Sequence, residues 1–190
     1  MIKIEMLVLD RHPERLKRPD FPVLIKNTFN DNTDKLDKCA NFQEVFSLVK
    51  KSVKASLNRG RAGLMLYLVD LPLGLGAYHE VGSNGIVMNR ALLEQVIQTA
   101  DSKREINAFV YSILLHEYIH TLGCIDELQT RKLTYLVSKE TFGEDHIATQ
   151  MAEAGPWAFI KLNPQDDTYR FRRDVEIVKN FEIPEHRYIS

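Results

Sequence analysis

The stretch REINAFVYSILLHEYIHTLG, residues 104–123, decides the fold because it predicts one long helix that is apolar on most of its surface. Its large apolar side chains recur at helical spacing: Ile106, Phe109, Val110, Ile113, Leu114, Leu115, Ile119 and Leu122. A helix of this kind is buried, so we expect it at the centre of the domain. Asp101 or Ser102 can cap its start, and Gly123 can adopt the left-handed conformation that ends a helix.

The end of this predicted helix carries three ionisable side chains, His116, Glu117 and His120. Residues four apart lie on one helix face, so both imidazoles can bind one zinc ion at about 2.0–2.1 Å. Glu117 lies one position round the helix, where its carboxylate can reach a water molecule beside the metal. Burying all three groups is costly unless they bind a metal or one another. The pattern therefore predicts a Zn²⁺ site with Glu117 as general base. The alternative is a pair of histidines hydrogen-bonded around Glu117.

Residues 116–126, HEYIHTLGCID, resemble the metzincin metallopeptidase pattern HExxHxxGxxH/D. In that family a glycine turns the chain so that a residue beyond the helix returns to the metal. The resemblance implies Asp126 as the third zinc ligand. It also implies a methionine turn under the metal, for which Met151 is the only downstream methionine; an ordinary helix end is the alternative reading of Met151.

A second amphipathic helix is predicted directly after Asp126, over residues 127–140. A second helix that carries a glutamate resembles the gluzincin arrangement of thermolysin-like peptidases. Glu140 stands at the usual distance of their third ligand, Glu127 would suit a compact member, and His146 is a further alternative. Helix capping explains Asp126 and Glu127 without any metal, because acidic side chains are favoured at a helix N-terminus.

The leading functional interpretation is a zinc-dependent metalloprotease, a hydrolase in which water attacks a peptide bond and Glu117 transfers the proton. A second resemblance is to the bacterial endoribonuclease family YbeY, whose motif HxxxHxxGxDH has the same spacing. The chain has Glu117 and Asp126 where that family has glycine and histidine. A third interpretation is a non-catalytic protein that binds a partner on a zincin scaffold.

The composition is that of an ordinary globular protein. With 190 residues, of which 44% are hydrophobic, the chain can form one sizeable core. Its formal net charge of −1 gives no electrostatic reason to expect nucleic acid or an anionic membrane as a partner. The basic residues between Arg11 and Arg18 lie among prolines and are expected in a solvated loop.

The cellular location is predicted from three kinds of sequence signal that the chain lacks: a membrane span, a secretory signal and a disulfide pattern. No apolar run approaches the roughly 18 residues of a membrane span. Residues 1–10 have an acid within their apolar run and no small-residue cleavage site, so we expect a strand there and not a secretory signal. Cys39 and Cys124 show no patterned spacing, which favours a reduced, cytoplasmic compartment.

The order of elements favours the α+β class, with a single-domain zincin-like fold. We expect a small twisted mixed sheet packed on a backing helix and on the buried HExxH helix, followed by a helical C-terminal part. The backing helix should run from a capping box at Asn41 to about Leu57. Residues 62–70 and 85–89 are predicted strands, and residues 91–100 a helix.

The substrate is expected at the edge of this sheet. In the zincin family an edge strand pairs with an extended peptide as an added strand, and residues 77–89 are the candidate for it, with His79 and Glu80 facing cleft or solvent. A peptide or protein is thus the expected partner, with no nucleic acid and no membrane. The catalytic domain is predicted over 1–168, with a partly ordered tail over 169–190 whose Glu185 or His186 could reach the metal and keep the protein latent.

Overall fold

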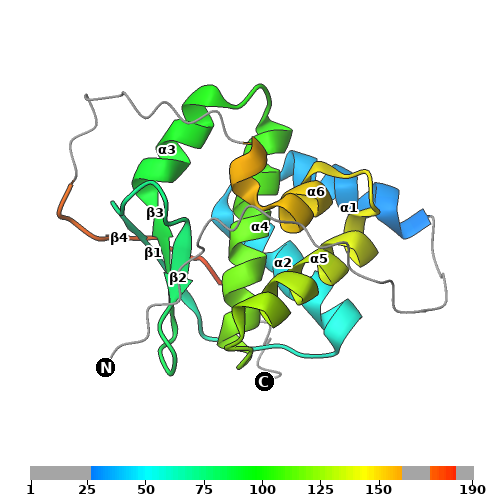
Figure 1. The fold of residues 1–190 in the computed structure, drawn as a ribbon, viewed down its shortest axis with the longest axis horizontal. Helices are drawn as coiled ribbons and strands as arrows, with labels where there is room; N and C mark the ends of the chain where they lie inside the picture. The colour runs from blue at the N-terminus through cyan, green and yellow to red at the C-terminus, as the bar shows by residue number, and fades with distance from the viewer. Residues whose placement is uncertain (1–26, 160–171, 183–190) are drawn as a thin grey trace, which may run out of the picture.

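Helix α4 (Lys103–Thr121) runs between a small sheet and four other helices in the computed structural model, which describes residues 27–159 and 172–182 (Figure 1). The helix begins where predicted, because the Ser102 side chain accepts a hydrogen bond from the Glu105 amide at 3.3 Å. It ends at Thr121, and Gly123 follows with a φ of 93°, a conformation that suits glycine. Its predicted burial is confirmed: nearly every side chain from Asn107 to Ile119 is buried.

The sheet has four strands among the described residues, in the order β2-β3-β1-β4. These are β1 (Met65–Val69), β2 (Ala77–His79), β3 (Gly85–Asn89) and β4 (Glu176–Ile177). Strands β1 and β3 are parallel, whereas β2 and β4 lie antiparallel at the two edges. The sheet is therefore mixed, and the predicted α+β class is confirmed.

One asparagine holds the loop that joins β1 to β2. The buried Asn89 donates its side-chain amide to the carbonyls of Leu71, Pro72 and Leu75. Its carbonyl oxygen accepts from the amide of Leu92 and so caps α3 (Arg90–Thr99). The predicted helix at 91–100 is thus present and is fixed to the sheet at its first residue.

The remaining helices pack on the other side of α4 (Figure 1). They are α1 (Asn27–Lys38), α2 (Phe42–Leu57), α5 (Glu127–Phe142) and α6 (Ile147–Ala154), followed by the short 3₁₀ helix η1 (Pro156–Phe159). The capping box predicted for α2 is present: Asn41 accepts from the Glu44 amide, and Glu44 reaches back to the Ala40 amide. The backing helix over residues 42–57 is confirmed.

Helix α1 has no counterpart among the predicted elements. Its sequence NTFNDNTDKLDK is rich in weak helix formers, which is why the pattern reads as a loop. Tertiary contacts compensate: Leu36 is fully buried, and the side-chain amide of Asn107 on α4 donates to the carbonyls of Leu36 and Cys39. These bonds satisfy carbonyls that the end of α1 would otherwise leave unpaired.

Residues 172–182 of the predicted tail pack on the rest of the domain, although only Phe181 among them is buried in the core. They contribute β4, and Phe181 stacks on Phe46 of α2 with ring centroids 4.2 Å apart. Glu182 accepts from the Leu64 amide at 2.8 Å and pairs with Lys50. The segment is therefore held by both the sheet and a helix.

Several predictions fall outside the described residues. These are the strand at 1–10, the loop at 11–18, the boundary at 168–169, and the inhibitory roles of Glu185 and His186. Within the described ranges, no helix combines the length and apolar character needed to cross a membrane.

We expect Phe181→Ala to lower the free energy of unfolding by about 3–5 kcal/mol, because it removes a ring that is only 3% exposed. Ile177→Ala on β4 is the matched control, since that side chain is 52% exposed and should change stability by less than about 0.5 kcal/mol. Urea denaturation measures both. Equal stability of wild type and Phe181→Ala would show that the C-terminal segment does not pack as described.

Candidate metal centre

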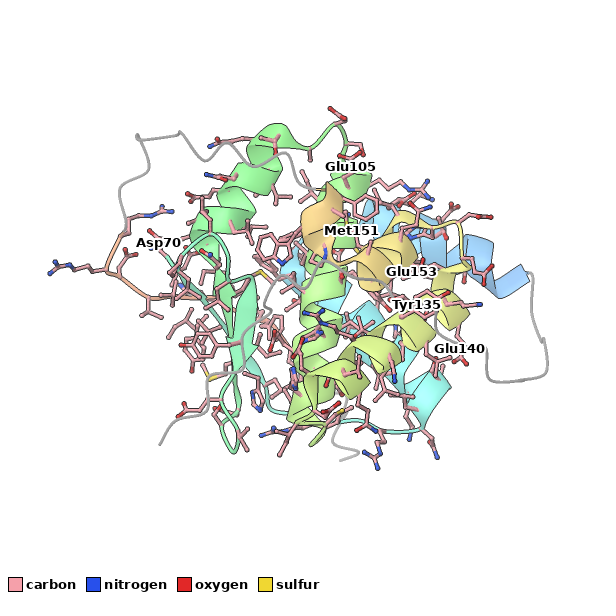
Figure 2. The ribbon with its side chains drawn as sticks, viewed as in Figure 1. Asp70, Glu105, Tyr135, Glu140, Met151 and Glu153 are labelled. Atoms are coloured by element: carbon pink, nitrogen blue, oxygen red, sulfur yellow. The ribbon has the colours of Figure 1, made fainter. Side chains whose placement is uncertain are left out.

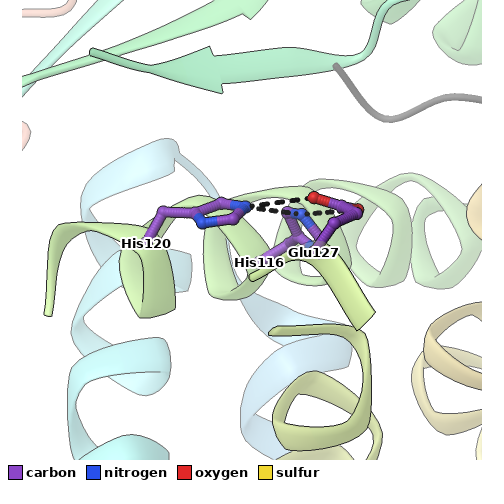
Figure 3. A group of neighbouring side chains, drawn as sticks. All are labelled: His116, His120 and Glu127. Atoms are coloured by element: carbon purple, nitrogen blue, oxygen red, sulfur yellow. Dashed lines mark hydrogen bonds and ion pairs between the residues drawn. The ribbon is translucent and has the colours of Figure 1, made fainter. Parts of the chain in front are cut away.

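Three ligand atoms converge at the end of α4 (Figure 3). The Nε2 atoms of His116 and His120 lie 3.1 Å apart. Each also lies 3.3 Å from an oxygen of Glu127, Oε1 for His116 and Oε2 for His120. A tetrahedral zinc ion with bonds of about 2.0–2.1 Å separates its ligand atoms by about 3.3–3.4 Å. Each imidazole thus lies at about such a distance from the Glu127 carboxylate, although from a different oxygen, and the three side chains offer the donor set of a catalytic zinc site.

A tight reversal of the chain brings Glu127 to the histidines. Gly123 turns the chain directly after α4, and α5 begins at Glu127. Asp126 is the N-cap of α5: its Oδ1 accepts from the Gln129 amide at 2.7 Å. The two helices pack against each other, so a side chain in the first turn of α5 can reach the last turns of α4.

A backbone carbonyl orients the imidazole of His120. Its Nδ1 lies 2.7 Å from the carbonyl oxygen of Cys124, which can only accept, so we assign the proton to Nδ1. The lone pair is then on Nε2, the atom that faces His116 and Glu127. Ligating histidines commonly have this second contact, which fixes both tautomer and ring orientation. The hydroxyl of the buried Thr130, which donates to the Asp126 carbonyl at 2.9 Å, lies 3.3 Å from the same Cys124 carbonyl oxygen.

The electrostatics of the group favour a cation among the three side chains. Burial opposes charge on His120, but its contact with Glu127 and the nearby Glu117 charge outweigh burial and raise the pKa of His120. Burial likewise opposes charge on Glu127, yet contacts with His116 and His120 hold the pKa of its carboxyl well below the usual range. A divalent cation among these ligand atoms would interact favourably with the same carboxylates.

Glu117 lies beside the three ligand atoms without belonging to their group. Its side chain is 1% exposed, and its charge contributes to the raised pKa of His120. The next residue, Tyr118, points elsewhere: its hydroxyl donates to the Arg61 carbonyl at 3.0 Å and accepts from the Arg61 amide at 2.8 Å. Glu117 is therefore a buried acidic side chain near the group but outside its ligand set, and Tyr118 is structural.

The structure keeps the other candidate ligands away from this group. The Asp126 side chain is occupied as the N-cap of α5 and is exposed. Glu140 is exposed near the far end of α5 (Figure 2), thirteen positions and about 20 Å along the helix from Glu127. His146 caps α6 through its Nδ1 and stacks on Phe142 at 4.6 Å. The three convergent atoms thus include one of the proposed alternatives, Glu127, and not Asp126, our first choice.

The expectation of a methionine turn is wrong for Met151. This residue lies within α6 and is buried beside Glu105 and Phe109, at the opposite end of α4 from the histidines (Figure 2). His116 lies eleven positions beyond Glu105 on α4, about 16 Å along the helix. Met151 therefore packs the core without supporting the candidate metal site.

His79 is buried on β2, so of the two positions predicted for it, facing cleft or solvent, the structure excludes solvent. Its side chain is 6% exposed, and its Nδ1 lies 2.9 Å from the carbonyl oxygen of Gly85. Burial lowers the pKa of His79, and the charges of Arg61 and His120 lower it further, so the ring lies within electrostatic reach of the candidate site. Glu80 is exposed, as predicted.

Arg61 joins the end of α4 to the β2–β3 turn. Its Nη1 donates to the Thr121 carbonyl at 3.1 Å, and its Nη2 donates to the Ser83 carbonyl at 2.5 Å. A positive charge at a helix C-terminus also interacts favourably with the helix dipole. Sequence reasoning missed this residue, because an arginine between two glycines carries no signal of a tertiary contact.

No family model matches the chain, and comparisons with curated proteins and with solved structures found no significant similarity.

We expect Glu127→Gln to weaken zinc binding by more than the roughly 10–100-fold typical of a residue that only supports a ligand, because it removes the charged donor itself. Asp126→Asn is the matched control, since asparagine also caps helices well and should leave zinc affinity unchanged. Zinc competition with a chromogenic chelator measures both variants. The opposite result, loss in Asp126→Asn and retention in Glu127→Gln, would restore Asp126 as the ligand.

The stability of the protein should depend on pH through His146. Burial, with a smaller effect of Arg104, lowers the pKa of this histidine to about 4, so the unfolded state takes up its proton first as pH falls. The contribution to stability is complete above about pH 6.5 and is lost towards pH 4, at up to about 1.4 kcal/mol per pH unit.

His146→Asn tests this dependence, because asparagine can cap α6 but cannot titrate. Urea denaturation of both proteins between pH 7 and 4.5 should give a shallower loss of stability in the variant. Parallel curves for the two proteins would rule out His146 as the source.

Proposed function

We propose that this protein is a zinc-dependent metallopeptidase of a compact, gluzincin-like type. The observation that carries the proposal is the convergence of His116, His120 and Glu127, whose ligand atoms lie within 4.8 Å of one another, with the buried Glu117 nearby. A third ligand at the start of the helix after HExxH favours the gluzincin-like reading. The capping role of Asp126 argues against the metzincin-like one.

In this proposal His116, His120 and Glu127 hold the metal, and Glu117 moves the proton. A bound zinc ion supplies Lewis acidity to the attacking water and the scissile carbonyl. Glu117 takes the proton from the attacking water and returns it to the nitrogen of the leaving amine. The Cys124 carbonyl keeps the His120 ring oriented throughout, and Arg61 holds the end of α4 against the β2–β3 turn.

The proposed substrate is a peptide segment in extended conformation. Strand β2 is an edge of the sheet as far as the chain is described, and it packs beside α4. Backbone groups on the outer side of an edge strand can pair with an added strand. Such pairing recognises the main chain of a peptide and does not depend on one particular side chain. His79 on β2 lies within electrostatic reach of His120, so a peptide paired with β2 would pass near the proposed metal site.

We expect Glu117→Gln to retain zinc and to lose at least about 100-fold in peptide hydrolysis, because the amide cannot accept the proton and is not a ligand. Cleavage of a quenched fluorescent peptide library, together with zinc content by atomic absorption, measures the two properties. Glu140→Gln at the far end of α5 is the control, since it changes an exposed glutamate about 20 Å along the helix from Glu127. Unchanged hydrolysis in zinc-loaded Glu117→Gln would refute the proposal.

A further inference from the structure

The carboxylate of Glu127 has a cationic neighbour on its own helix. The Nε atom of Arg131 lies 3.1 Å from Oε1 of Glu127, within hydrogen-bond distance. Oε1 is also the oxygen nearest His116, whereas Oε2 faces His120 at 3.3 Å. Arg131 thus contacts one particular oxygen of the carboxylate that we propose as third ligand.

The contact matters because Glu127 is poorly restrained by packing. Its side chain is about one-third exposed, and it stands in the first turn of α5, where the helix has only begun. A glutamate side chain loses considerable rotamer entropy when it is held in one geometry. A contact that orients the Glu127 carboxylate before a metal binds reduces the entropy cost of metal binding.

Arginine is suited to this task at this spacing. Residues four apart are neighbours on a helix surface, so Arg131 reaches Glu127 without distorting α5. The guanidinium group is planar and always charged, and it presents its N–H groups in a rigid fork that fits a carboxylate. Lysine offers only a flexible point charge there.

We propose that Arg131 is a positioning residue for the metal site: it holds the Glu127 carboxylate in the orientation that meets His116 and His120. This inference rests on the zinc site of the proposed function, but not on the reaction catalysed there. It concerns metal affinity, so its test does not depend on hydrolysis.

The experiment compares zinc affinity in the full-length chain for wild type, Arg131→Gln, Arg131→Lys and Lys132→Gln. Lys132 is the matched control, because it is exposed and its replacement removes the same charge from the adjacent position of α5. Zinc dissociation constants come from competition with a chromogenic chelator. The melting temperature of each metal-free protein is measured in parallel.

We expect Arg131→Gln to bind zinc about 10–100-fold more weakly, the usual effect of losing a group that supports a ligand. Arg131→Lys should lie between this variant and wild type, and Lys132→Gln should match wild type. The metal-free melting temperatures should agree within about 2 °C, because a partly exposed pair at this spacing contributes little to stability. Should Arg131→Gln fold poorly, Arg131→Met, which keeps much of the aliphatic stem, carries the same expectation.

Wild-type affinity in Arg131→Gln, or an equal loss in Lys132→Gln, would overturn the inference while leaving the peptidase proposal in place. A second outcome separates the two proposals: the wild type binds zinc but cleaves no peptide, and Arg131→Gln binds zinc more weakly. This result would support the positioning role of Arg131 and refute the peptidase proposal. A wild type that binds no zinc would overturn both.

Discussion

Two imidazole nitrogens 3.1 Å apart, both facing one carboxylate, need a proton or a metal ion between them. This requirement governs the end of α4, because the lone pairs would otherwise repel one another in a region largely withdrawn from water. A shared proton satisfies it in one way and a divalent cation in another. Much of the surrounding structure serves to keep the three groups together despite that cost.

Backbone atoms do a large part of this work. The Cys124 carbonyl orients His120, and carbonyls of α4 and the β2–β3 turn receive the two ends of the Arg61 guanidinium. Of these carbonyls only that of Thr121 lies in a helix, and those of Cys124 and Ser83 lie in short connections between elements. The contacts therefore depend on how the elements meet. The sheet and the helical layer meet at the end of α4, so a structural change in either layer would alter the positions of the two histidines.

Local signals in the sequence predicted the elements that carry the site. The apolar circumference of residues 104–123, the cap at Ser102 and the capping box at Asn41 all act over a few residues, and the structure confirms each. The choice between Asp126 and Glu127 could not be made in this way. Neighbouring carboxylates at a helix start are alike in sequence, and only the turn geometry shows that one caps the helix while the other faces the histidines.

Features that depend on distant contacts were beyond prediction for a different reason. Helix α1 has weak intrinsic propensity and is held by Asn107 from α4, while Phe181 joins the core from a segment that reads as a polar tail. Arg61 and Arg131 look like ordinary charged residues until their partners are known. Such contacts carry no local pattern, since their partners come from the tertiary arrangement.

The three converging side chains lie within a single helical hairpin, from His116 to Glu127. Closing so short a loop costs little chain entropy, whereas the pairing of β1 with β4 joins segments far apart in the chain. Contacts of short sequence separation form early in folding, and distant strand pairings form late. The hairpin that holds the ligands can therefore take shape before the sheet is complete, and a cation captured at that stage would stabilise a folding nucleus as well as the finished protein.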